Sequence, residues 1–195
     1  MLDRHARPYF NPIFAKSAEF FIEHKVSANQ ITFIALGIGL LAGLVLYLGI
    51  GWLSILLLWL SGYLDAVDGE VARMQNTANP FGAQLDIVFD RIVELSIVWA
   101  LAFRFPEARL ALVILCSAIL ISMTIFLTSG QVLKKPGKKS FYYQAGLMER
   151  TEGFIAFTFM ILLPAHLTTL TLIYALLIFF TAGQRIWEAY TYFRD

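Results

Sequence analysis

Four aspartates within an otherwise apolar segment constrain this chain more than any other feature. They are Asp65, Asp68, Asp86 and Asp90. If both flanks are helical, the first pair is spaced i, i+3 and the second i, i+4, so each pair lies on one helix face. Pro80 breaks the helix between the pairs, and the two faces can then fold back on each other. Carboxylates that converge in a low-dielectric setting need a cation among them, and hard oxygen ligands favour Mg²⁺, Mn²⁺ or Ca²⁺.

The amino-acid composition predicts an all-α integral membrane protein. Of the 195 residues, 58% are hydrophobic and only 15% are charged, whereas about 25% of residues in soluble domains are charged. The mean hydropathy is +0.68. Because this length leaves little room beyond the membrane spans, we expect one membrane-embedded domain over residues 1–195. The lone Cys116 excludes an internal disulfide and is expected to be a packing residue.

Six transmembrane helices are expected within residues 31–190. These spans begin near residues 31, 52, 81, 109, 144 and 167. The first is uncharged from Ile31 to Ile50 and long enough to cross a hydrocarbon core of about 30 Å, whereas the second and fifth are too short unless charged residues are included. The second, third and fifth spans must carry charged residues near one end, namely Asp65, Asp68, Asp86, Asp90, Arg91, Glu94, Glu149, Arg150 and Glu152. Intramembrane ionisable residues are functional by default, because each costs about 2.5 to 3.5 kcal/mol at a helix centre.

Residues 1–30 are expected to form a juxtamembrane helix and not a targeting segment, since they contain no apolar run of the signal-peptide type. Apolar and charged residues alternate there at near-helical spacing: Phe10, Ile13, Phe14, Phe21 and Ile22 against Lys16, Glu19, Glu23 and Lys25. This pattern is typical of an amphipathic helix that lies in the membrane interface. A helix packed against the rest of the protein is the alternative.

The distribution of lysine and arginine predicts the orientation. With the N-terminus inside, nearly all of these residues lie on the cytoplasmic side, and only Arg104 and Arg109 lie outside. The charged ends of the second, third and fifth spans then share a polar cavity that opens to the cytoplasm.

The aspartate segment also resembles a family signature. It reads D-x2-D-G-x2-A-R-x8-G-x3-D-x3-D from Asp65 to Asp90, which is similar at every defined position to the signature of the CDP-alcohol phosphotransferases, membrane enzymes that make phospholipids. The resemblance implies transfer of a substituted phosphate group from a CDP-linked lipid to a hydroxyl acceptor, with release of CMP. It implies two Mg²⁺ or Mn²⁺ ions held by Asp65, Asp68 and Asp86, with Asp90 near the second ion as the base. It also implies a homodimer in a bacterial or archaeal plasma membrane, with no nucleic-acid partner.

Six residues are expected from the resemblance to contact the nucleotide: Gly69, Ala72, Arg73, Gly82, Asn29 and Thr32. Gly69, Ala72 and Gly82 lack bulk where the nucleotide must approach the helices. For Gly82, close helix packing is the alternative role. Asn29 and Thr32 lie in a segment that resembles the start of the first span in relatives, with Ala28 in place of proline. Capping of that helix is their alternative role.

The segment from Gly146 to Glu152 bears on the identity of the acceptor. It resembles the Gly-x-x-Glu-Arg-x-Glu stretch of family members that use inositol phosphate. This implies that Arg150, with Lys134 and Lys135, binds an anionic acceptor such as a polyol phosphate. Those members carry arginines where this chain has the two lysines, which can serve as point-charge partners for a phosphate. The alternatives are a structural ion pair for Arg150 and a lipid-attracted anchor for the lysines.

Two other classes of protein are alternatives to the enzyme. Converging intramembrane carboxylates also suit a divalent-cation or proton-coupled transporter. Such a protein would need acidic residues along a path, and the external halves of the expected spans contain none. A scaffold with a vestigial site is disfavoured because all four aspartates are present.

Overall fold

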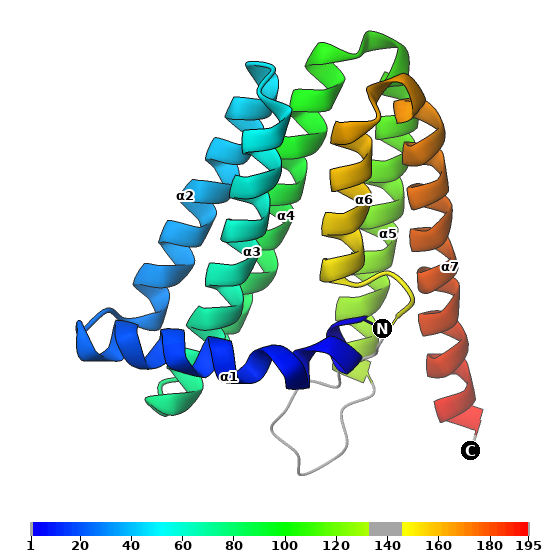
Figure 1. Ribbon diagram of the computed structural model, residues 1–195. Coiled ribbons are helices and arrows are strands. Elements are labelled where there is room, and N and C mark those ends of the chain that lie inside the picture. Colours follow the sequence, from blue (N-terminus) through cyan, green and yellow to red (C-terminus); the bar gives the residue numbers. More distant parts are fainter. Residues whose placement is uncertain (1, 133–145, 195) are drawn as a thin grey trace. The chain divides into compact units, whose positions relative to one another are not determined.

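The computed structural model describes residues 2–132 and 146–194, and all regular secondary structure in this part of the chain is helical (Figure 1). Two compact units are present. Residues Ala6–Pro106 form one, and the described residues from Glu107 onward, with the first residues of the chain, form the other. The all-α prediction is confirmed.

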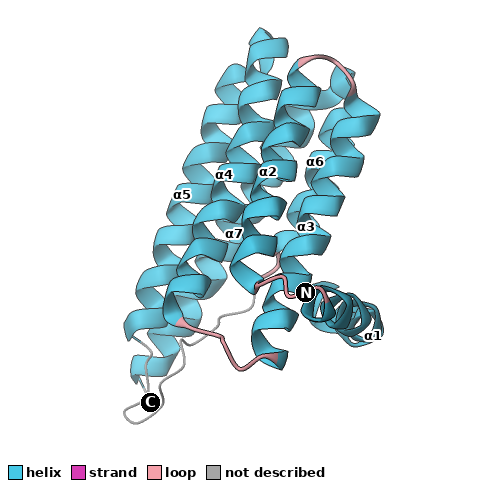
Figure 2. Ribbon diagram, turned by 90° about the vertical axis from the view of Figure 1, so that its left-hand side faces the viewer, coloured by secondary structure: helices cyan, strands magenta, loops and turns pink. Residues whose placement is uncertain are grey.

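The first unit contains α1 (Leu2–Glu23) from Ala6 onward, α2 (Ala28–Tyr47), α3 (Gly51–Met74) and α4 (Pro80–Arg104). Helix α2 packs against both α3 and α4. Helix α1 lies crosswise at the end where α2 begins and α3 ends (Figure 1), and Figure 2 shows it almost end-on. The carboxyl-terminal part of α3 and the amino-terminal part of α4 therefore lie at the same end as α1.

Local capping explains where α2 and α4 begin. Ser27 and Gln30 form a reciprocal capping box at the start of α2. At the start of α4, the Asn79 side chain accepts a hydrogen bond of 2.9 Å from the backbone N–H of Gly82, and Pro80 occupies the first turn, where its missing N–H costs nothing. The break predicted at Pro80 is thus the start of a helix.

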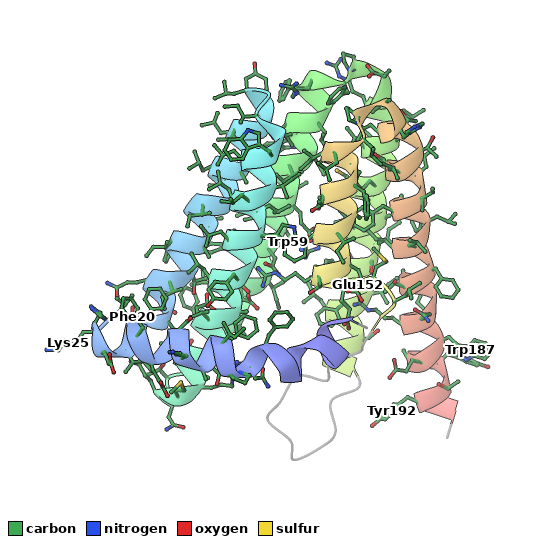
Figure 3. The ribbon with its side chains drawn as sticks, viewed as in Figure 1. Phe20, Lys25, Trp59, Glu152, Trp187 and Tyr192 are labelled. Atoms are coloured by element: carbon green, nitrogen blue, oxygen red, sulfur yellow. The ribbon has the colours of Figure 1, made fainter. Side chains whose placement is uncertain are left out.

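A hydrophobic cluster joins α1 to α2 and α3. Its buried members are Ala18, Ile31, Ala35, Leu64, Val67 and Val71, and Phe14 and Phe21 of α1 pack against them. On its other side, α1 exposes Phe10, Ile13 and Phe20, the last of these 55% exposed and labelled in Figure 3. One face of α1 therefore packs against protein, as in the alternative interpretation, while apolar side chains remain exposed on the other.

Small residues let α2 approach its two neighbours closely. The Ser61 hydroxyl of α3 donates a hydrogen bond of 2.8 Å to the carbonyl of Ala35. The Ser96 hydroxyl of α4 lies 2.7 Å from the carbonyl of Val93 on its own helix and 3.3 Å from the carbonyl of Gly39 on α2, so the same hydroxyl reaches across to α2. A methyl group at Gly43 would lie 2.8 Å from the backbone oxygen of Ser96, which is closer than such atoms pack. The α2–α4 contact thus depends on the absence of a side chain at position 43.

The second unit contains α5 (Arg109–Val132), α6 (Arg150–Leu162) and α7 (Leu167–Arg194), with short 3₁₀ turns at Pro106–Ala108 and Pro164–His166. Helix α7 packs against both α5 and α6. The rings of Phe157 and Tyr174 meet edge to face at 5.6 Å between α6 and α7.

Helix α6 differs from the expected fifth span. A helix beginning near Gln144 was predicted, but Gln144 lies outside the described residues, and α6 begins only at Arg150 with Glu149 as its N-cap. The backbone N–H of Leu147 donates to the Gln184 side chain and that of Met148 to Thr181, at 3.3 and 3.0 Å. These N–H groups are satisfied by α7, so they need no helical partners.

Three stretches of the described chain are long and apolar enough to cross a membrane: Ala28–Tyr47, Pro106–Gly130 and Pro164–Tyr192. They coincide with the first, fourth and sixth predicted spans. Helices α3 and α4, with 24 and 25 residues, are long enough but contain the charged aspartate segment, and α6 has only 13 residues.

The close approach at Gly43 can be tested with a matched pair of variants. We expect Gly43→Ala to destabilise the protein, because overpacking costs about 1–3 kcal/mol, whereas Gly37→Ala meets nothing within 4 Å and should be neutral or stabilising. Thermal unfolding of the detergent-purified variants measures both. Equal melting temperatures for the two variants would contradict the close α2–α4 packing.

Candidate metal centre

The aspartates come from two helices that share α2 as a neighbour. Asp65 and Asp68 lie in the carboxyl-terminal half of α3, and Asp86 and Asp90 lie in the first half of α4. A loop of five residues, 75–79, joins the two helices. Because both helices pack on α2, their aspartate faces lie at the same end of the unit.

Three of the four aspartates meet. Asp65, Asp86 and Asp90 each offer a carboxylate oxygen, and these three oxygens lie within 4.8 Å of one another. Asp65 is buried, and the other two are partly buried. Three carboxylates so close together repel one another strongly where water is scarce, and a cation between them would relieve that repulsion.

Asp68 is not a member of this group of three, but it lies close enough to act electrostatically on Asp86 and Asp90. Its side chain is only 7% exposed. One of its oxygens, Oδ2, is buried with no hydrogen-bond partner in the described part of the chain. A buried carboxylate oxygen without a donor is available to a metal ion, so the residues present fit an oxygen-liganded divalent cation.

Two of the predicted nucleotide contacts lie side by side. A methyl group placed at Gly82 would be 3.9 Å from the Asn29 side-chain oxygen and 3.8 Å from that of Asn79. These are ordinary contact distances to flexible side chains, so Gly82 is not needed for close helix packing. The alternative role for Gly82 is therefore wrong in this structure.

The capping alternative for Asn29 and Thr32 is also wrong, because Ser27 is the N-cap of α2. The exposed Asn29 is the second residue of the helix. Thr32 is buried beside Asp68, and its hydroxyl donates a hydrogen bond of 3.0 Å to the carbonyl of Ala28.

The carboxyl-terminal end of α3 borders an open groove. Gly69 and Ala72 are partly buried on α3, and Arg73 is half exposed, with its guanidinium bonded to Glu70 one turn earlier. The groove has a volume of about 620 Å³ and is lined by Asn11, Pro12, Ala15, Glu70 and Arg73. A methyl group at Gly69 would lie 3.4 Å from the Arg73 guanidinium, an ordinary contact distance to a flexible side chain.

Of the predicted acceptor residues, Arg150 belongs to the second unit. Arg150 is the first residue of α6, and its guanidinium carbon lies 5.6 Å from the centre of the Phe154 ring. Glu149 accepts a hydrogen bond from the backbone N–H of Gly146 at 3.3 Å. Lys134 and Lys135 lie outside the described residues.

Arg185 of α7 was not predicted as a site residue, yet it is only 7% exposed. Its guanidinium donates to the hydroxyl of Ser122 at 3.2 Å and lies 4.8 Å from the centre of the Phe126 ring, both on α5. The sequence feature that points to this residue is an arginine, four residues after Thr181, within a helix that is otherwise largely apolar. The Thr181 hydroxyl accepts a hydrogen bond from the backbone N–H of Met148, just before α6. The face of α7 that carries Thr181 therefore positions the start of α6.

Comparison with known proteins supports the same family as the aspartate pattern. The CDP-alcohol phosphatidyltransferase family model matches residues 25–191. The chain is 29% identical over 200 residues to the inner membrane protein YnjF of Escherichia coli, covering 97% of this chain and 96% of YnjF. It is 33% identical over 169 residues to the phosphatidylinositol phosphate synthase of Corynebacterium glutamicum, covering 80% of this chain and 71% of that enzyme.

The fold is similar to that of the phosphatidylinositol phosphate synthase PgsA1 of Mycobacterium tuberculosis. That enzyme with CDP-DAG bound matches with a TM-score of 0.75 at 20% identity, over 92% of this chain and 94% of the other. Its complex with manganese and citrate matches with a TM-score of 0.76 at 19% identity, over 91% and 89% of the two chains. At these identities the likeness concerns the fold.

These matches, the intact aspartate motif and the apolar helices agree with one another. The protein is an integral membrane protein and a transferase of phospholipid biosynthesis, and the chain belongs to the CDP-alcohol phosphatidyltransferase family.

Proposed function

We propose that this chain transfers a phosphatidyl-type group from a CDP-linked lipid, such as CDP-diacylglycerol or CDP-archaeol, to the hydroxyl of a polar acceptor. The observation that carries the proposal is the convergence of Asp65, Asp86 and Asp90 within 4.8 Å. A donor of this kind is supported by the PgsA1 structure with CDP-DAG bound. Family membership favours this transferase over the transporter hypothesis.

The four aspartates are proposed to hold two Mg²⁺ or Mn²⁺ ions. All four offer hard oxygen ligands on buried or partly buried side chains, among them the buried Oδ2 of Asp68. The PgsA1 complex with manganese supports a divalent ion. When bound, the metal supplies positive charge against the pyrophosphate and neutralises charge that develops during transfer.

Asp90 is proposed to be the general base. Its carboxylate accepts the proton of the acceptor hydroxyl, and the acceptor oxygen attacks the phosphorus that carries the lipid alcohol. A new acceptor O–P bond forms, and the bond from that phosphorus to the CMP oxygen breaks, so that CMP leaves. The remaining aspartates orient the donor, since positioning and electrostatics do most of the work in phosphoryl transfer.

The nucleotide is proposed to contact residues at the same end of the first unit. Gly69 and Ala72 provide space on α3, and Arg73 at the open groove offers a cation to phosphate oxygens. Asn29, in the first turn of α2, and Gly82, in the first turn of α4, lie next to each other. Thr32 lies one turn further along α2, beside Asp68.

The acceptor is proposed to be an inositol phosphate or another polyol phosphate, bound by Arg150 with Lys134 and Lys135. The similarity to a phosphatidylinositol phosphate synthase supports this class. Arg150 follows a segment that Thr181 and Gln184 hold against α7, which limits where its guanidinium can lie.

For the membrane arrangement, we propose a homodimer of single-domain protomers, each with six spans and α1 in the cytoplasmic interface. Lysine and arginine distribution supports the orientation. The exposed apolar face of α1 suits lipid contact. Exposed Trp187 and Tyr192 project from the end of α7 (Figure 3), and such aromatic side chains favour the membrane–water boundary.

Activity is the first test. We expect the purified protein to release CMP from CDP-diacylglycerol or an archaeal CDP-lipid only with Mg²⁺ or Mn²⁺ and the correct alcohol. Labelled donor should be screened with inositol 1-phosphate, glycerol 3-phosphate, free inositol and serine. Absence of CMP with every acceptor and metal, together with metal uptake into liposomes, would instead support the transporter.

Substitution of the four aspartates distinguishes the proposed metal ligands from the proposed general base. Asp65→Asn, Asp68→Asn and Asp86→Asn should each remove metal and nucleotide binding, because the remaining carboxylates are then under-compensated. Asp90→Asn should lower turnover by about 10²-fold or more while retaining substantial CDP-lipid affinity. Since Asp90 also lies in the group of three, calorimetric titration of all four variants is decisive. An equal loss of CDP-lipid affinity in all four variants would show that Asp90 is primarily a metal ligand.

The acceptor assignment is tested at Arg150. We expect Arg150→Ala to raise the acceptor KM by tenfold or more, about 1.4 kcal/mol, with unchanged CDP-lipid affinity, because only a ground-state acceptor contact is lost. Arg109→Ala, at the start of α5, is the control for loss of an exposed arginine. If Arg150→Ala mainly lowers the melting temperature, or if the acceptor is uncharged, the phosphorylated-acceptor proposal is abandoned.

A further inference from the structure

An ion pair lies directly beyond the aspartates on α4. The guanidinium of Arg91 is 2.7 Å from Oε2 of Glu94, and the two side chains are 31% and 6% exposed. Glu94 is thus among the most deeply buried charged residues in the described part of the chain. Its immediate neighbour Val93 and the nearby Ile97 are also buried, so this carboxylate lies in an apolar setting.

Glu94 extends the line of carboxylates. Asp86, Asp90 and Glu94 are spaced i, i+4 and i+8, which places them in succession along one face of α4. Glu94 is not among the three carboxylates whose oxygens converge in the described structure. It is therefore a buried acid, one turn from the candidate metal ligands, that the proposed reaction does not use.

Arg91 is close enough to influence the metal ligands as well. Its positive charge acts on both Asp86 and Asp90, in addition to its contact with Glu94. A guanidinium presents five N–H donors and cannot lose its charge, so it competes with a divalent cation for nearby carboxylates. Without another acid beside it, Arg91 would have to be neutralised by the aspartates alone.

We propose that Glu94 is a positioning residue for the metal centre: it provides Arg91 with a carboxylate partner outside the aspartate cluster. The aspartates then retain their negative charge for a divalent cation. The short i, i+3 spacing on one helix keeps the pair together whether or not the metal is bound. This inference rests on the proposed metal site and adds a residue that sets its affinity.

Mn²⁺ titration of the detergent-purified protein, without substrate, tests the inference. We expect Glu94→Gln to weaken Mn²⁺ binding by about tenfold, because Arg91 then competes for Asp86 and Asp90. Arg91→Gln should bind Mn²⁺ at least about threefold more tightly than the unmodified protein, since the competing cation is removed. The double variant should return to within about threefold of the unmodified protein, because both charges are absent.

Arg104→Gln is the matched control. It removes the same charge from the other end of α4, where the Arg104 side chain donates to the carbonyl of Tyr47 at 3.2 Å, and it should leave Mn²⁺ affinity unchanged. A merely structural pair would weaken Mn²⁺ binding in both single variants without recovery in the double variant, which overturns the inference. If Glu94→Gln does not fold, the tighter binding expected of Arg91→Gln still decides the question, because unchanged or weaker binding overturns it.

Failure of the metal site itself gives a different result. If the unmodified protein does not bind Mn²⁺, or if Asp86→Asn leaves binding intact, the proposed site and this inference both fall. If Asp86→Asn abolishes binding while Glu94→Gln has no effect, only the positioning role of Glu94 is overturned.

Discussion

The mutual repulsion of Asp65, Asp86 and Asp90 is the constraint that the packing of the first unit must satisfy. Three carboxylates with oxygens within 4.8 Å oppose the folded state unless rigid packing holds them and positive charge compensates them. The rigidity comes from α2, which packs against both α3 and α4 and carries Gly43 at a close contact with α4. A catalytic centre built on packed helices is positioned more precisely than one built on loops.

Charge compensation in this chain is local. Arg91 pairs with Glu94 and Arg73 with Glu70, in each case three residues apart on one helix. Such pairs form when the helix forms, so they do not depend on the approach of another element. In a membrane these two pairs help the charged segments of α3 and α4 to remain helical, because each arginine has an acidic partner on its own helix. The convergence of Asp65, Asp86 and Asp90 concentrates negative charge at one place, and this suits the cluster to bind a cation.

In the second unit, polar side chains of α7 provide hydrogen bonds to the backbone that a longer α6 would otherwise satisfy. Thr181 and Gln184 accept hydrogen bonds from the backbone before α6, and the buried Arg185 donates to Ser122 of α5. The same face of α7 therefore ties α5 and the start of α6 to one helix. Arg150 begins α6 at a defined position because backbone groups that would otherwise extend the helix are already bonded.

The sequence by itself determined the all-α class, the first, fourth and sixth apolar spans, the aspartate spacing and the family, because helical periodicity and hydropathy are local properties of the chain. It also predicted that carboxylates from two helices would meet. Only the tertiary structure decided that Asp65, Asp86 and Asp90 form the group of three, that Ser27 and not Asn29 caps α2, and that α6 begins at Arg150. The reason is physical: distances between helices depend on how side chains such as Ser61, Ser96 and Thr181 pack, and no spacing along the chain encodes them.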